Sequence, residues 1–208
     1  MAAKWTWVAV AGGALGAVLI GTVAAITLAP RGDAFAECRG GQVAGGDIGG
    51  PFTLVDENGN TVTDQDVITA PTIVYFGYTF CPDICPMDTQ RNAFALEELE
   101  DRGIIANGLF ISIDPERDTP EVLRDFTANF HDRLLGLTGT PEQVAAASRA
   151  YRTIYQKEEG GDPEYYLMSH STFTYLDMPG VGFVDFVNRD ATPEEIADRV
   201  QCFVEAAG

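Results

Sequence analysis

The first apolar stretch of the chain lies at its N-terminus. Residues 5–30 contain no charged side chain, and a mainly apolar run covers residues 8–29. As a helix this run would be about 33 Å long, enough to cross a hydrocarbon core of roughly 30 Å. We therefore predict a membrane anchor over residues 1–32. Lys4 precedes the run, and the positive-inside bias places the N-terminus in the cytoplasm.

A cleaved signal peptide is the alternative interpretation of this segment. Ala34-Phe35-Ala36 resembles a small-x-small cleavage site, but the apolar run exceeds the usual core of about 7–15 residues. We favour the uncleaved anchor, and both interpretations send the rest of the chain across the membrane. Residues 33–50 are rich in glycine, which is typical of a flexible tether.

The pattern after residue 50 predicts one folded domain over residues 51–208. Two short strand-like runs flank Asn58-Gly59, a strong signal for a hairpin. A continuous β-branched and aromatic run at residues 72–78 predicts a strand buried on both faces. Helical spacing follows over residues 87–101, with three predicted core positions: Phe94, Leu96 and Leu99.

The second half of the domain continues the alternation of strands and helices. Strands are predicted at residues 104–113, 134–137, 165–168, 171–176 and 182–187, and helices at 120–130, 141–155 and from 193 onward. Each of these helices begins with a Thr-Pro pair, which suits an N-cap followed by proline in the first turn. The order of elements is typical of an α/β fold.

Charge excludes one class of function. The chain carries 13 basic and 31 acidic residues, and Lys4 and Arg31 are the only bases before residue 33. The remaining segment therefore has 11 bases against 31 acids, a net charge of −20. Such a surface repels phosphate backbones, so we expect no nucleic-acid partner. The acidity favours solubility more simply than it favours a basic partner.

The four cysteines divide into a close pair and two distant residues. Cys81 and Cys85 lie in the string CPDICP, directly after the predicted strand at residues 72–78. Each precedes a proline, which favours a loop that ends where a helix begins near Pro86. A thiolate at Cys85 would be favoured by the helix dipole, and the spacing lets both sulfurs converge. The alternative is a structural disulfide between them.

Only two histidines occur, His131 and His170. His131 lies in a polar helix end and is expected to be exposed. His170 lies between two predicted strands, where a structural role is the alternative to ligation. Two thiolates and one imidazole suit Cu(I) or Cu(II), with zinc as another candidate. Met168 is a conceivable soft ligand, but strand alternation favours core packing.

The distant cysteines are Cys38, in the tether, and Cys202, in the last helix. The apolar stripe of that helix consists of Ile196, Val200, Phe203 and Val204. Cys202 points away from this stripe, and a free exposed thiol is a liability in an oxidising compartment. We predict a Cys38–Cys202 disulfide, with two unpaired thiols as the alternative.

With these residues in place, the chain resembles the Sco (SenC) family of copper-binding cytochrome c oxidase assembly factors. The matching strings are YFGYTFCPDICP at residues 75–86, SIDPERDTP at 112–120, LLGLTGT at 134–140 and the strand around His170. The likeness covers nearly all residues from about 51 to the end. It implies a thioredoxin-like fold with an N-terminal transmembrane helix, and copper bound by Cys81, Cys85 and His170. The family often has an acidic residue before the histidine, where this chain has Ser169.

The resemblance also implies a function and a location. The chain would be a copper metallochaperone for the binuclear copper centre of cytochrome c oxidase, at a bacterial inner membrane with its domain in the periplasm. Its partner would be the copper-bearing oxidase subunit, with another periplasmic copper chaperone as a further candidate. The alternative is a thiol-disulfide oxidoreductase that reduces the oxidase cysteines through Cys81 and Cys85. A peroxidase-like thiol enzyme of the same fold is a third hypothesis, so enzymatic activity stays open.

One further segment has two interpretations. Residues 114–118 follow a predicted strand end, where α/β folds place binding loops. Their charged side chains would either form a partner surface or pair within a loop that caps the next helix. The sequence does not rank these two roles.

Overall fold

A computed structural model describes residues 33–40, 48–159 and 165–208 of the chain. The predicted anchor over residues 1–32 lies outside these residues. Among the residues that are described, no helix is both long and apolar enough to cross a membrane. Residues Glu37–Gly208 form one compact unit.

A mixed sheet of seven strands forms the centre of this unit. Its order is β2-β1-β5-β4-β3-β8-β9, and β3, β4 and β5 run parallel, whereas the outer strands are antiparallel to their neighbours. The strands are β1 Thr53–Asp56, β2 Thr61–Thr63, β3 Thr72–Gly77, β4 Asn107–Ser112, β5 Leu134–Thr138, β8 Thr174–Met178 and β9 Gly182–Val187. A separate hairpin joins β6 Tyr155–Lys157 to β7 Met168–His170.

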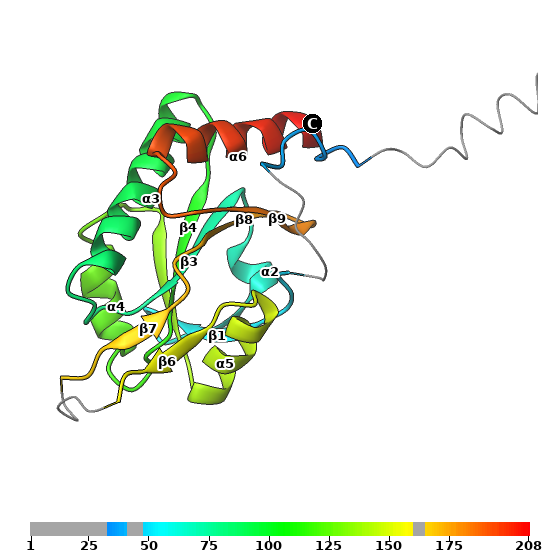
Figure 1. Ribbon diagram of the computed structural model, residues 1–208. Coiled ribbons are helices and arrows are strands. Elements are labelled where there is room, and N and C mark those ends of the chain that lie inside the picture. The colour runs from blue at the N-terminus through cyan, green and yellow to red at the C-terminus, as the bar shows by residue number, and fades with distance from the viewer. Residues whose placement is uncertain (1–32, 41–47, 160–164) are drawn as a thin grey trace, which may run out of the picture. The chain divides into compact units, whose positions relative to one another are not determined.

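Helices cover both faces of the sheet (Figure 1). They are α2 Asp64–Val67, α3 Ile84–Asp101, α4 Pro120–Thr127, α5 Pro141–Ala150 and α6 Pro193–Ala207. α3, α4 and α6 lie on one side, and α2 and α5 on the other (Figure 1). Alternation along β3 supplies both faces, because Tyr75 contacts Phe110 on the first side and Phe76 contacts Tyr151 on the second. The mixed α/β class is confirmed.

Local sequence explains where several elements begin. Thr119, Thr140 and Thr192 are the N-caps of α4, α5 and α6, and each hydroxyl accepts a backbone N–H three residues later. Proline follows each cap because the first helical amides have no partner within the helix. The predicted hairpin at Asn58-Gly59 forms, and Gly59 has the positive φ of 82° that the turn requires.

Several predicted boundaries were wrong by a few residues. The strand expected from residue 104 begins at Asn107, because Gly103 adopts a left-handed conformation and ends α3 with a bond from Ile104 N–H to the Leu99 carbonyl. The helix expected to reach residue 155 ends at Ala150, where Arg152 has a positive φ of 53°.

The strands around the second hairpin also shift. Residues 165–168 and 171–176 were predicted as strands, whereas the structure has β7 at Met168–His170 and β8 at Thr174–Met178. Pairing with β6 fixes β7, since His170 lies opposite Tyr155. The helix expected over residues 120–130 ends at Thr127.

One predicted core position was wrong. Phe94 is 48% exposed, whereas Leu96 and Leu99 are fully buried as expected. Hydrophobicity alone misplaced the buried stripe of α3, because four residues that are not strongly apolar are part of it: Cys85, Asp88, Thr89 and Asn92.

Candidate metal centre

The junction between β3 and α3 positions both close cysteines. All six residues of β3 are buried, and the chain leaves its end in a turn closed by a bond from Cys81 N–H to the Tyr78 carbonyl, at 3.3 Å. α3 begins at Ile84, two residues before the predicted start at Pro86. The ring of Pro86 fits inside the first turn because that amide needs no helical partner. Cys85 therefore lies in the first turn, with Cys81 looped over the helix start.

The β7 strand brings His170 to the same point. Its Nε2 lies 3.3 Å from the Cys85 Sγ, and one ligand atom from each of Cys81, Cys85 and His170 lies within 4.8 Å of the others. The three predicted residues therefore meet, although 85 positions separate Cys85 from His170. Cys81 and Cys85 are free thiols. The structural disulfide between them, given as an alternative, is absent from the structure.

The orientation of the imidazole follows from its backbone contact. His170 Nδ1 lies 2.8 Å from the Ser171 carbonyl oxygen, which can only accept a hydrogen bond. Nδ1 must therefore carry the hydrogen, and Nε2 presents its lone pair toward the sulfurs. Ser169 is exposed, and alternation along β7 places it on the other face from His170. The backbone, not the preceding side chain, fixes the ring.

The electrostatics of the two thiols differ in an unexpected way. Hydrogen bonds from the Cys85 thiol and from the backbone N–H groups of Cys85 and Asp83 lower the pKa of Cys81 to about 5, against the opposing effect of burial. The Cys85 N–H lies 3.3 Å from the Cys81 Sγ. The hydrogen bond between the two sulfur groups, together with burial, raises the pKa of Cys85 instead. The sequence placed the favoured thiolate at Cys85, and the structure places it at Cys81, because the loop sulfur accepts hydrogen bonds from the Cys85 thiol and from the free amides at the helix start.

Two aromatic rings enclose the histidine. The rings of Tyr75 and Tyr78 meet the His170 ring edge-on, with centroids 6.3 and 5.9 Å away. The Tyr78 hydroxyl accepts the Met168 N–H at 3.2 Å, which ties the β3 end to the strand that carries His170. Met168 packs partly buried against the core, as expected.

The loop over residues 114–118 supports the start of the cysteine loop through hydrogen bonds, and this contact is called the brace. The fully buried Asp118 accepts hydrogen bonds from the Thr79 N–H, the Thr79 hydroxyl and the Ser112 hydroxyl. Thr79 is two residues before Cys81, so this carboxylate anchors the start of the ligand loop. Nothing in the local sequence indicated this contact, because its partners are 39 and 6 positions away.

Arg117 adds an aromatic contact to the same brace. Its guanidinium lies 4.5 Å from the Phe80 ring centroid and 3.6 Å from that of Tyr166, while Asp114 accepts its Nε–H at 2.5 Å. Asp114 also accepts the Tyr166 hydroxyl at 2.7 Å. The interpretation of this segment as a charge-paired loop is therefore confirmed, and a role as partner surface stays a prediction.

His131 takes no part in this cluster. Its side chain is only 9% exposed, so the expectation of an exposed histidine was wrong. Its Nδ1 accepts the Arg133 N–H at 3.0 Å, and its Nε2 lies 3.8 Å from a Glu100 carboxylate oxygen. The histidine holds the turn between α4 and β5.

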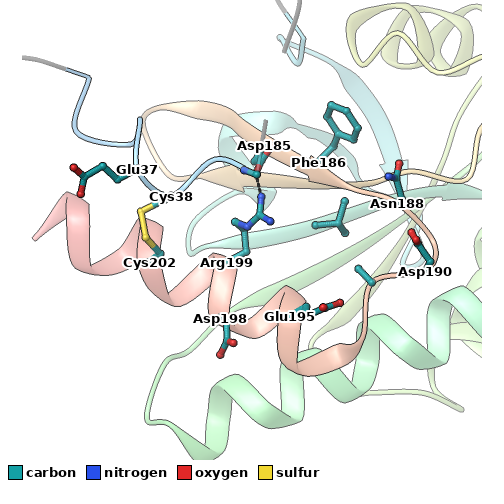
Figure 2. Close-up of a pocket in the computed structure, with 13 residues that line it drawn as sticks. Glu37, Cys38, Asp185, Phe186, Asn188, Asp190, Glu195, Asp198, Arg199 and Cys202 are labelled. Atoms are coloured by element: carbon teal, nitrogen blue, oxygen red, sulfur yellow. Dashed lines mark hydrogen bonds and ion pairs between the residues drawn. A yellow bond between two sulfur atoms is a disulfide. The ribbon is translucent and has the colours of Figure 1, made fainter. Parts of the chain in front are cut away.

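The distant cysteines form the predicted disulfide. Figure 2 shows the Cys38–Cys202 bond between the N-terminal segment and α6, with Cα atoms 5.6 Å apart. Asp185 strengthens this attachment, because it accepts the Gly40 N–H at 3.2 Å and pairs with Arg199. The bond borders a cavity of about 670 Å³, and none of Cys81, Cys85 and His170 lines it.

Comparisons with known proteins agree with this geometry. The family model described as SCO1/SenC matches residues 41–205. Protein SenC of Rhodobacter capsulatus is 54% identical over 191 residues, which cover 91% of this chain and 86% of that protein. The chain spans about half the length of several mitochondrial relatives that it also matches.

Solved structures extend the comparison to the fold. Arabidopsis thaliana ScoI with copper bound is 39% identical, with a TM-score of 0.71 and coverage of 76% of this chain and 99% of that one. BsSco, described as a member of the Sco family of cytochrome c oxidase assembly proteins with a disulfide switch, is 25% identical, with a TM-score of 0.62 and coverage of 75% and 93%. The predicted thioredoxin-like α/β fold is thereby confirmed.

Proposed function

The chain belongs to the SCO1/SenC family, and from this premise we propose that it is a copper metallochaperone for the binuclear copper centre of cytochrome c oxidase. Copper is its cargo, received and passed on by exchange of ligands. The copper-bearing oxidase subunit is the proposed recipient, and another periplasmic copper chaperone is a candidate donor. The copper-bound ScoI of Arabidopsis and the description of BsSco support this proposal.

One observation carries the proposal: Cys81, Cys85 and His170 present two sulfurs and one imidazole nitrogen within 4.8 Å. Soft thiolates hold Cu(I), and an imidazole extends the range to Cu(II). We assign the three side chains as the copper ligands. The low pKa of Cys81 supplies one thiolate before the metal arrives, and Cys85 releases its proton on binding. Three donors leave a position at which a recipient thiolate can enter.

The proposed location is a bacterial inner membrane, crossed once by the predicted helix, with the domain in the periplasm. The Cys38–Cys202 disulfide supports this location because such bonds persist in oxidising compartments. The anchor over residues 1–32, the tether over 33–50 and the copper-binding domain over 51–208 together form the proposed organisation.

A second function is favoured by the acidity of Cys81. A pKa of about 5 makes this sulfur a thiolate at neutral pH, and the thiolate is the species that attacks disulfides. The chain would then reduce a disulfide between the cysteines of the oxidase copper site to two thiols, and Cys81 and Cys85 would be oxidised to a disulfide. This oxidoreductase needs both sulfurs but has no use for His170.

The two histidines provide a matched test. Titration of the reduced full chain with Cu(I) should give one copper per chain, and His170→Ala should weaken binding while His131→Ala does not. Copper should then move from the loaded chain to the reduced, copper-free oxidase subunit. Binding that is unchanged in His170→Ala, together with no transfer, would contradict the copper function.

A deletion strain separates delivery from thiol reduction. If delivery is the main role, added copper restores oxidase activity, and His170→Ala fails to complement without it. Full complementation by His170→Ala without added copper would favour the oxidoreductase.

A further inference from the structure

A second cavity lies at the opposite end of the sheet from the cysteine cluster. It has a volume of about 360 Å³ and is bordered by residues 48–51, by α2 and by the turn between β8 and β9. Asp177, in the wall of this cavity, lies opposite Thr72, the first residue of β3. Cys81 lies in the loop beyond the last residue of the same strand. Six residues of strand separate the two ends by roughly 20 Å. The cavity is therefore independent of the copper ligands.

Asp177 is the unusual member of this cavity. It is 2% exposed, and its Oδ1 accepts the Tyr151 hydroxyl at 3.0 Å. Its Oδ2 is buried and has no hydrogen-bond partner in the structure. A buried carboxylate oxygen without a partner costs free energy that a donor in the cavity would offset. Burial, with the Asp64 carboxylate nearby, raises the pKa of Asp177 to about 7.

The rest of the wall limits what can bind. Asp64 and Asp177 are its acids, and none of the described residues that line it is basic. Polar and apolar groups contribute about equally to the lining, and the apolar side chains include Ile48, Ile68, Val181 and Phe183. A pocket of this size that combines apolar side chains with a few convergent polar groups can hold a small ligand. Its charge selects a cation.

The kind of cation follows from the single free oxygen. A guanidinium binds a carboxylate best through two parallel bonds, and Tyr151 already occupies Oδ1. Calcium needs six to eight oxygen ligands and magnesium a near-octahedral set, whereas the side chains of this lining offer only two carboxylates, one of them bonded to Tyr151, and the Gln65 amide. An ammonium needs one strong acceptor and tolerates an apolar stem beside it.

We propose that this cavity binds a primary ammonium group on a short apolar stem, with Asp177 Oδ2 as its acceptor and Asp64 as a supporting charge. The ammonium belongs either to a free alkylamine or to a lysine side chain of a partner protein. The site is separate from the copper proposal and stands or falls without it.

The test is an NMR titration of the full chain in detergent micelles with n-butylamine and, as a neutral analogue, n-butanol. At about pH 8, above the pKa of Asp177, the amine should shift the amide signals of Gly49, Gly180 and Gly182. It should bind about tenfold or more tightly than the alcohol, as expected for a hydrogen bond to a charged group. Nα-acetyl-lysine methylamide should bind too if the source is a lysine, and should fail if it is a free amine.

Two variants and a control decide the outcome. Asp177→Asn should reduce amine binding to the level of the alcohol, and Asp125→Asn, which removes the same charge from the exposed side of α4, should leave it unchanged. Copper stoichiometry serves as the folding check. If Asp177→Asn does not fold, Asp64→Asn decides, with an expected loss of a fewfold. The proposal is overturned if the amine binds no better than the alcohol, or if the deciding variant binds it like the parent.

Discussion

The two cysteine pairs of this protein have opposite fates. Cys81 and Cys85, four positions apart, remain free thiols, whereas Cys38 and Cys202, 164 positions apart, form a disulfide. The close pair faces helix amides and an imidazole, which stabilise a thiolate and offer a third donor. The distant pair joins a terminal segment to α6. The surroundings of each sulfur, not its distance along the chain, separate reactive chemistry from covalent attachment.

The largest expected difference between the pairs is in copper binding. Cys81→Ser or Cys85→Ser should lower Cu(I) affinity by several orders of magnitude, beyond the roughly 100-fold cost of losing a supporting group. The double variant Cys38→Ser with Cys202→Ser should keep one copper per chain. Competition with a Cu(I) chelator measures both. If the Cys38/Cys202 double variant lost as much Cu(I) affinity as the Cys81 and Cys85 variants, the two pairs would not differ in copper binding.

Stability should show the reverse order. Loss of the Cys38–Cys202 bond should lower the free energy of unfolding by roughly 2–5 kcal/mol, because the unfolded chain is no longer closed into a long loop. Urea unfolding of the parent with and without a dithiol reductant measures this change. Cys81→Ser with Cys85→Ser should respond to the reductant as the parent does. A parent whose stability ignores reductant would contradict this expectation.

Acidity distinguishes the two free thiols from each other. The absorbance of the thiolate at 240 nm should follow a Cys81 titration near pH 5 in the reduced protein, and Cys85→Ala should move it upward. Alkylation near pH 6.5 should slow by only about two- to fourfold if the pKa returns to about 8.5, since the lower thiolate fraction is largely offset by higher nucleophilicity.

The same shift has a consequence for stability. The folded pKa of Cys81 lies below the unfolded value of about 8.5, so its contribution is complete above that pH and is lost as pH falls toward 5. Cys81→Ser should remove this part of the pH dependence. A Cys81 titration at the ordinary thiol pKa would show that the helix amides do not stabilise its charge.

The smallest effect is expected from the brace beneath the ligand loop. Asp118→Asn should weaken copper binding by less than about tenfold, because it loosens Thr79 without removing a ligand. The Cys38–Cys202 bond should form as before. Chelator competition, with Asp125→Asn as the matched control, measures the effect. If Asp118→Asn lost as much copper affinity as a cysteine variant, the expectation of a small, indirect effect would be wrong.

The sequence by itself determined much of this protein. Period-2 and helical patterns, Thr-Pro caps and Asn58-Gly59 located most elements, since caps and turns depend on neighbouring residues. Residue chemistry was sufficient to select Cys81, Cys85 and His170 and to predict the Cys38–Cys202 bond.

Tertiary structure decided what depends on distant contacts. Phe94 is exposed because polar residues of α3, among them Asp88 and Asn92, lie on its buried face instead. The acidic thiol is Cys81 because its sulfur accepts hydrogen bonds from the Cys85 thiol and, in space, from the amides at the helix start. The brace through Asp118 and the unpartnered oxygen of Asp177 have no local signature. Hydrogen bonding and burial between segments far apart in the chain are set only when those segments pack.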